Sequence, residues 1–78
     1  EVRLTLNGYT DAAGSAGYNR MVAESRASSV KAYLVARGVD PLRMSVVGKG
    51  ARDFAANNDS EAGRNLNRRV EIETRGSN

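Results

Sequence analysis

The chain has 78 residues and lacks cysteine and histidine, so it can form one small domain without a disulfide or a Cys/His metal site. A single core of this size rarely supplies more than about 3–5 kcal/mol. Twelve Lys and Arg against nine Asp and Glu give a net charge of +3, and ten of the twelve are arginine, which suits carboxylate and phosphate partners. No apolar run approaches the roughly 20 residues of a membrane span and no signal peptide is recognisable, so we expect a soluble segment.

The first predicted element is a strand, because Val2, Leu4 and Leu6 alternate with polar residues. It leads into the glycine-containing stretch "NGYTDAAGSAGYN", whose one acidic side chain is Asp11. Ligands of open α/β sheets bind at the carboxyl ends of strands, which makes Asp11 a candidate binding residue. An Asx-turn or a cap is the commoner role of aspartate in such loops, and both interpretations stay open.

The remaining elements are predicted from capping residues and periodicity. In chain order they are a helix from about Ala16 to Arg37 between the N-cap Ser15 and the C′ residue Gly38, a turn capped by Asp40 with Pro41, a strand at Met44–Gly48, a short helix capped by Asp59 or Ser60 and ending at Asn67, and a last strand in "RRVEIETR". We expect residues 76–78 to be frayed.

A strand, a helix and a strand in this order favour a parallel crossover, and the whole pattern indicates an incomplete α+β or α/β layer. One long helix covers one side of a sheet, so Val47 and the alternate positions of the other strands are expected to need burial. This predicts that the chain is a fragment, or that a partner subunit completes the layer.

Arg26 is a second candidate binding residue. On the helical wheel it falls between Tyr33 and Val30, in the middle of the apolar arc, and Asn19 points within about 20° of it. Arg26 can bury its stem and pair internally with Asp11 or with a carbonyl at a strand end. It can equally line a cleft and bind a ligand carboxylate through two charge-assisted hydrogen bonds. Asp11 and Arg26 together would then recognise a zwitterion.

A basic cluster before the last strand is the basis of an alternative function. Arg64, Arg68 and Arg69 would suit nucleic acid or another polyanion, although the accompanying aromatic residues are few. Enzyme chemistry is not expected, because the sequence offers no histidine, no cysteine and no carboxylate pair with a catalytic spacing. No metal ion or organic cofactor is needed for the functions considered.

Four motifs in the same order resemble the OmpA-like C-terminal domain. They are "NGYTDAAGSAGYN", "SRASSVKAYLVARGVD", "RMSVVGKG" and "EAGRNLNRRVEI". This family, which includes outer-membrane proteins, peptidoglycan-associated lipoproteins and flagellar stator subunits, binds peptidoglycan non-covalently. The resemblance implies a two-layer α+β sandwich of β-α-β-α-β-β topology, of which this chain has the later part. It also implies that the diaminopimelate residue of the stem peptide is the ligand, held by Asp11 and Arg26 with support from Thr10, Asn19 and Arg69.

The sequence also departs from the family pattern. Tyr9 stands where many members have histidine, and Ala13 replaces a residue that is commonly polar. The family's first strand and helix precede the point where this chain begins, so we expect residues 1–78 to be a single, N-terminally incomplete OmpA-like domain. The expected location is the cell envelope, at the periplasmic face of the outer membrane. A homodimer or an exchange of elements between subunits is a further expectation, and an internal Asp11–Arg26 pair in a purely structural fragment is the remaining alternative.

Overall fold

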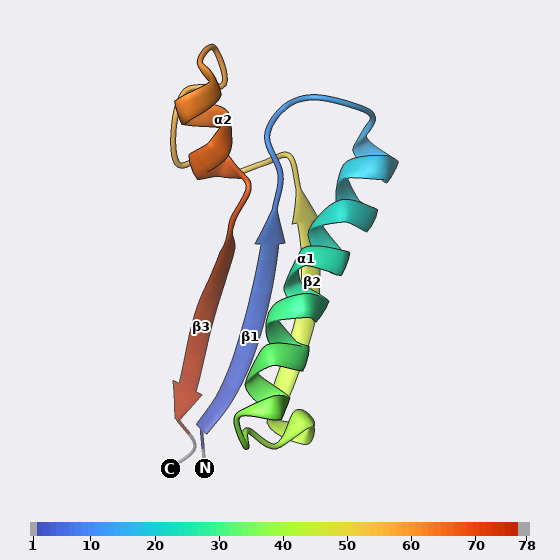
Figure 1. Cartoon of the computed structure of the whole chain (residues 1–78), viewed down its shortest axis with the longest axis vertical. Helices are drawn as coiled ribbons and strands as arrows, with labels where there is room; N and C mark the ends of the chain where they lie inside the picture. The colour runs from blue at the N-terminus through green and yellow to red at the C-terminus, as the bar shows by residue number, and fades with distance from the viewer. Residues whose placement is uncertain (1, 77–78) are drawn as a thin grey trace.

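The computed structural model describes residues 2–76, which form a three-stranded sheet with one long helix on one side (Figure 1). The strand order is β2-β1-β3, with β2 parallel and β3 antiparallel to the central strand. This confirms the predicted α+β class and the parallel crossover. The elements are β1 (Val2–Tyr9), α1 (Ala16–Ala36), the 3-10 turn η1 (Pro41–Arg43), β2 (Met44–Gly50), α2 (Glu61–Asn67) and β3 (Val70–Gly76).

The capping residues determine the helix boundaries as the sequence predicts. Ser15 accepts a hydrogen bond from the N–H of Tyr18, and Gly38 adopts a φ of 98° after the last turn of α1. Ser60, rather than Asp59, caps α2 by accepting from the N–H of Gly63. Asp40 caps η1 with Pro41 behind it, also as predicted.

The strands are longer than their periodicity indicates. β1 continues two residues beyond Asn7, and β2 continues to Gly50, because the two strands keep pairing past a register shift between Gly8 and Tyr9. Gly76 pairs with Val2 as the last residue of β3, so the expected fraying does not include it. Residues 77 and 78 lie outside the described residues.

The expectation that the face around Val47 needs burial is wrong. Cross-strand partners share a face of the sheet, and the register places polar residues around Val47 on the side opposite α1. On that side the Nδ2 of Asn7 donates to the Oε1 of Glu73 at 2.8 Å. A polar face can meet water without a covering layer. The side chains that share this face with Val47 are Arg3, Thr5, Asn7, Ser45, Glu71, Glu73 and Arg75.

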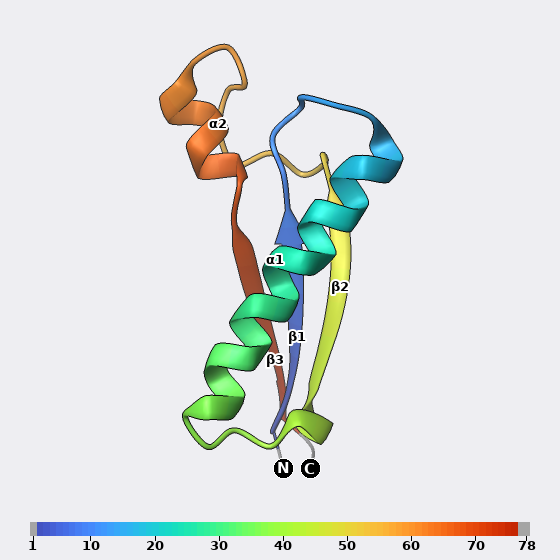
Figure 2. The ribbon, with the colours of Figure 1, turned by 45° about the vertical axis from the view of Figure 1, so that its right-hand side comes forward.

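The core lies between α1 and the two strands β1 and β2; the helix lies in front of β2 in Figure 1 and crosses β1 in Figure 2. Its buried centre is formed by Leu6, Ala27 and Met44, with partly buried aliphatic residues around it. The helix approaches β1 so closely that a Cβ on Gly8 would lie 1.9 Å from the carbonyl oxygen of Ala23. Glycine and alanine at the contact are therefore what allows this packing.

The buried face of α1 is rotated relative to the predicted arc. Its buried residues are Asn19, Ala23 and Ala27, whereas Tyr18 and Tyr33 are 60% and 57% exposed. The helical wheel counted the large aromatic residues as buried, but the close contact of α1 with the sheet leaves room only for small side chains.

None of the helices in residues 2–76 combines the length and the apolar character that crossing a membrane requires.

Candidate functional site

The predicted site residues gather at the end of the sheet where β1 and β2 finish and β3 begins. There the loop of residues 10–15 leads from β1 to α1, and α2 lies at the same end of the sheet (Figures 1 and 2). The N–H of Tyr9 donates to the carbonyl of Arg69, and the N–H of Thr10 donates to that of Gly50. These bonds hold the start of the loop between the two flanking strands.

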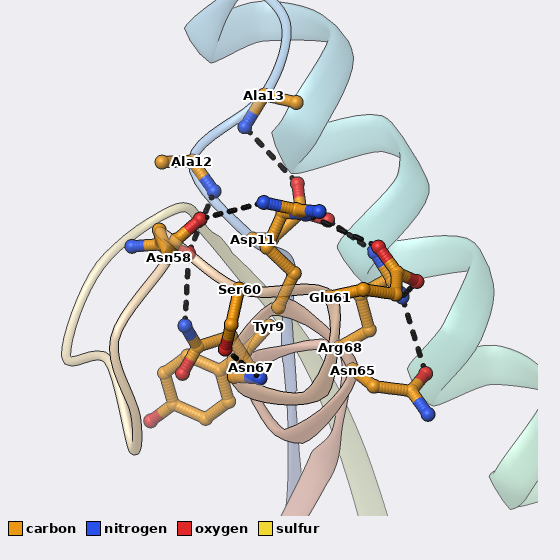
Figure 3. A network of polar contacts seen from close by, with 12 residues as sticks. Tyr9, Asp11, Ala12, Ala13, Asn58, Ser60, Glu61, Asn65, Asn67 and Arg68 are labelled. Carbon is orange, nitrogen blue, oxygen red and sulfur yellow. Dashed lines mark hydrogen bonds and ion pairs between the residues drawn. The ribbon is translucent and has the colours of Figure 1, made fainter.

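Asp11 is buried, and both of its carboxylate oxygens are engaged (Figure 3). Oδ1 accepts the N–H of Ala13 at 3.0 Å, which is the Asx-turn that the sequence analysis left open. Oδ2 accepts from Nη1 of Arg68, which is a residue of the distant C-terminal part of the chain. The carboxylate therefore both shapes its own loop and ties it to the end of α2.

Arg68 bridges two carboxylates. Its Nη1 binds Asp11, and its Nη2 binds Oε2 of Glu61 at 2.6 Å and Oδ1 of Asn65 at 3.1 Å (Figure 3). The N–H of Ala13 lowers the pKa of Asp11 below its ordinary value of 3.8, and the Arg68 guanidinium adds to this, whereas burial acts in the opposite direction. Asp11 therefore stays ionised at lower pH than an aspartate without these partners.

We expect the domain to lose stability in acid partly through Asp11. A carboxyl group whose pKa is lowered by folding contributes stability above its unfolded-state pKa, and this contribution disappears as the pH falls through the folded-state pKa. Chemical unfolding between pH 7 and pH 2 should therefore show a smaller loss of stability in acid for Asp11→Asn than for the wild type. Parallel stability curves for the two proteins would contradict this role.

Arg26 lies on the flank of α1 rather than at the centre of its buried face, and it is half-buried. Its Nη1 donates to the carbonyl oxygen of Tyr9, the last residue of β1, at 3.3 Å. This is the strand-end carbonyl considered in the sequence analysis. No ion pair joins Arg26 to Asp11 within residues 2–76, so the alternative of an internal pair between them is wrong.

The long side chain of Arg26 overcomes the separation along the helix axis. Arg26 is eleven residues beyond the N-cap Ser15, which corresponds to about 16 Å at 1.5 Å per residue. Helix side chains tilt toward the N-terminus, and the guanidinium reaches the strand end two residues before Asp11. The guanidinium of Arg26 and the loop that carries Asp11 therefore lie at the same end of the sheet.

An open groove of about 490 Å³ runs along α1 beside Arg26. All of its lining residues belong to the helix, so Asp11 is outside its lining. Arg26 is the only charged residue among them and connects the groove with the end of β1. The groove is lined by Met21, Val22, Ser25, Arg26 and Ser29.

Thr10 and Asn19 are both buried, with 4% of each residue exposed. The hydroxyl of Thr10 is enclosed and has no hydrogen-bond partner within residues 2–76. The Oδ1 of Asn19 faces the loop at Gly14, where a Cβ would lie 3.4 Å from it. Thr10 thus has an unsatisfied polar atom directly beside Asp11.

Thr10→Val is expected to raise the free energy of unfolding by about 1–2 kcal/mol, because it removes a buried hydroxyl that lacks a partner and keeps the shape of the side chain. Urea unfolding of this variant and of Thr74→Val, at an exposed position of β3, would measure the effect. A clear loss of stability in Thr10→Val alone would mean that the hydroxyl does have a partner in solution.

Arg69 lies over the ring of Tyr9, with 4.0 Å between its guanidinium carbon and the ring centroid. Its Nε binds Glu71 at 2.6 Å and its Nη2 donates to the carbonyl of Asp53 at 2.7 Å. Burial and the Glu71 carboxylate raise the pKa of Tyr9, so its phenol stays neutral at physiological pH. Arg69 and Tyr9 thus form a stacked pair of side chains that is held in place at the end of β1.

Arg26 reaches the carbonyl of Tyr9, which directly precedes Thr10 and Asp11 in the chain, but Asp11 itself pairs with Arg68. The structure also adds residues that the sequence analysis missed. Arg68 was noted only as part of a basic cluster, because nothing in the spacing indicates its contact with a residue 57 positions earlier. Asn67 was noted only as a helix end, although its side chain is completely buried. A capping serine followed by a short polar helix is too general a signal to have identified either role.

The comparisons with known proteins identify the family. A sequence profile described as "OmpA family" matches residues 1–68, and the chain belongs to this family. It is 51% identical over 70 residues to Outer membrane protein A of Bordetella avium, which covers 90% of this chain and 36% of the relative. It is 47% identical over 72 residues to Peptidoglycan-binding protein ArfA of Mycobacterium tuberculosis, which covers 92% of this chain and 22% of the relative.

Solved structures support the same fold. The C-terminal domain of Helicobacter pylori MotB superposes with a TM-score of 0.89 at 31% identity, covering 99% of this chain and 60% of that chain. The peptidoglycan-associated lipoprotein of Burkholderia pseudomallei gives a TM-score of 0.89 at 28% identity, covering 95% and 63%. The resemblance and the OmpA-like architecture are thus confirmed, and the relatives are named as an outer membrane protein, a peptidoglycan-binding protein and a peptidoglycan-associated lipoprotein.

The chain spans about a third or less of the length of these two curated relatives and under two thirds of the two matched structures.

Proposed function

We propose that this domain binds peptidoglycan non-covalently and anchors an envelope protein to the cell wall at the periplasmic face of the outer membrane. Two relatives support this through their names, a peptidoglycan-binding protein and a peptidoglycan-associated lipoprotein. Within the wall polymer, we propose the diaminopimelate residue of the stem peptide as the ligand. The end of its side chain carries an ammonium and a carboxylate on one carbon atom.

The observation that carries this proposal is the hydrogen bond from Arg26 to the carbonyl of Tyr9, because it brings a guanidinium to the strand end that leads into Asp11. This bond uses one of the five N–H donors of the guanidinium, so two parallel N–H groups can still bind a carboxylate. An ionised carboxylate has about four acceptor positions, and Asp11 uses two of them. One ligand carboxylate and one ligand ammonium therefore have complementary partners.

The supporting residues have distinct roles in this proposal. Thr10 offers an unsatisfied hydroxyl, which a small rearrangement at the ligand would engage. Asn19, in the first turns of α1, supports the loop of residues 10–15, and Arg69 supports the end of β1 through its contact with the ring of Tyr9. Each contact contributes little binding free energy, so a single stem peptide should bind with about −4 to −8 kcal/mol, which corresponds to a Kd in the millimolar to micromolar range. A polymer with many stem peptides raises the effective affinity through avidity.

Titration of the isotope-labelled domain with two muropeptides tests the proposal. One carries diaminopimelate, and the other carries lysine, which lacks the side-chain carboxylate. We expect saturable shifts of the amide signals of residues 9–13 and of Arg26 with the first ligand and at least tenfold weaker binding of the second. Equal affinity for the two would reject diaminopimelate recognition, and no response to either would reject peptidoglycan binding at this site.

The polyanion alternative has less support, because the guanidinium groups of its three arginines already have protein partners. Arg64 binds Glu61 and the carbonyl of Asn58, and Arg68 and Arg69 are engaged as described above. A nucleic-acid phosphate would have to replace these contacts. Binding of an oligonucleotide with a steep salt dependence that survives Asp11→Ala would favour the alternative nonetheless.

A further inference from the structure

A buried amide at the end of α2 fixes the loop between β2 and α2. Asn67 is completely buried, and its Oδ1 accepts the N–H groups of Ala55 and Ala56 at 2.8 and 3.0 Å. Its Nδ2 donates to the carbonyl of Ala56 and to the Oδ1 of Asn58, both at 2.9 Å. Since only oxygen can accept from two backbone N–H groups, the orientation of this amide is determined by its partners.

Asn58 extends this network to the candidate site. Its Oδ1 accepts from Asn67 and also from the N–H of Ala12, at 3.3 Å, the residue that follows Asp11 (Figure 3). The next N–H, of Ala13, is held by Asp11 itself. Two consecutive backbone N–H groups of the loop are thus bound by side-chain oxygens, one of them from a segment 46 residues away.

We propose that Asn58, oriented by Asn67, is a positioning residue for the Asp11 carboxylate. This inference rests on the proposed function and deepens it by assigning the fixed geometry of the binding loop to the loop before α2. Arg68 holds the Asp11 side chain, but only Asn58 holds the backbone of the loop from that segment. Without Asn58 the peptide unit between Asp11 and Ala12 loses its partner, and the carboxylate no longer has one orientation.

Asn58 is the suitable position for a test, since truncating the completely buried Asn67 would remove four hydrogen bonds and endanger folding. Asn58→Ala removes the bridging oxygen. Asn58→Asp keeps an oxygen for Ala12 and Asn67, and Arg64, which binds the Asn58 carbonyl at 2.9 Å, lies close enough to moderate the added charge. Asp59→Ala, at an exposed neighbouring position, is the matched control.

In the ligand-free domain, Asn58→Ala should accelerate amide hydrogen exchange at Ala12 and Ala13, and Asn58→Asp should restore protection. With the diaminopimelate muropeptide, Asn58→Ala should raise the Kd about fivefold, while Asn58→Asp and Asp59→Ala should stay within about twofold of the wild type. A general loss of stability would instead accelerate amide hydrogen exchange throughout the chain, and the Asn58→Asp variant would not restore protection.

The outcomes separate this inference from the proposed function. If the wild type binds the muropeptide and Asn58→Ala binds it equally well with unchanged exchange at Ala12, the positioning role is rejected and the proposed function stands. If exchange responds as expected but no muropeptide binds to the wild type, the role of Asn58 in holding the loop stands and the proposed function is rejected.

Discussion

Replacing Gly8 with alanine is expected to abolish most of the stability of the domain. The added Cβ would lie 1.9 Å from the carbonyl oxygen of Ala23 and 2.7 Å from its carbonyl carbon, which are backbone atoms of α1. A side chain could rotate away, but here the helix itself must lift from the sheet, and it carries the buried core residue Ala27 with it. A core of about 3–5 kcal/mol cannot absorb such a displacement.

Gly17→Ala is the matched control for this variant, because a Cβ at Gly17 meets nothing within 4 Å and the residue lies in the first turn of α1. Alanine there should leave stability unchanged or raise it by up to about 1 kcal/mol. Urea unfolding followed by circular dichroism compares the two variants with the wild type. A Gly8→Ala protein with a wild-type midpoint would contradict the close packing of α1 on β1.

The second large effect is expected at Arg26 and concerns binding rather than folding. Arg26→Gln loses one hydrogen bond to a backbone carbonyl, so the free energy of unfolding should fall by only about 1 kcal/mol. The same change removes the cation proposed to hold the ligand carboxylate in two hydrogen bonds, so affinity for the diaminopimelate muropeptide should fall about 10- to 100-fold.

Arg20→Gln makes the same charge change on an exposed residue of the same helix and should bind nearly as well as the wild type. The two titrations are run at one ionic strength, since long-range attraction depends on salt. A large loss of stability in Arg26→Gln together with normal binding by the folded fraction would assign Arg26 a structural role instead.

Local features of this fold could be predicted from the sequence with good accuracy. Ser15 and Gly38 define the ends of α1 because a cap depends on residues within one turn of it. The strands β2 and β3 could be predicted from the alternation of side chains between the two faces of a strand, which is also a local signal. The sequence therefore indicated the order of elements, their α+β class and the candidates Asp11 and Arg26, and the family resemblance added Thr10, Asn19 and Arg69 to these candidates.

Long-range features could not be predicted in this way. The wheel placed Arg26 in the centre of the apolar arc, but the helix rotates so that Ala23 can approach Gly8. Similarly, the partner of Asp11 is Arg68 rather than Arg26, because chain reversals bring the end of α2 beside the first loop. Contacts between small residues and between distant loops leave no periodic signal in one sequence.

The most direct test of a two-pole site combines protein variants with ligand variants. The wild type, Arg26→Gln and Asp11→Asn are each titrated with the diaminopimelate muropeptide and with a form whose side-chain carboxylate is amidated. We expect amidation to weaken binding to the wild type and to Asp11→Asn at least tenfold but to leave binding to Arg26→Gln nearly unchanged, because the partner of the ligand carboxylate is already missing there. If amidation weakens binding to Arg26→Gln as much as to the wild type, Arg26 does not bind the ligand carboxylate, and the proposed recognition is wrong.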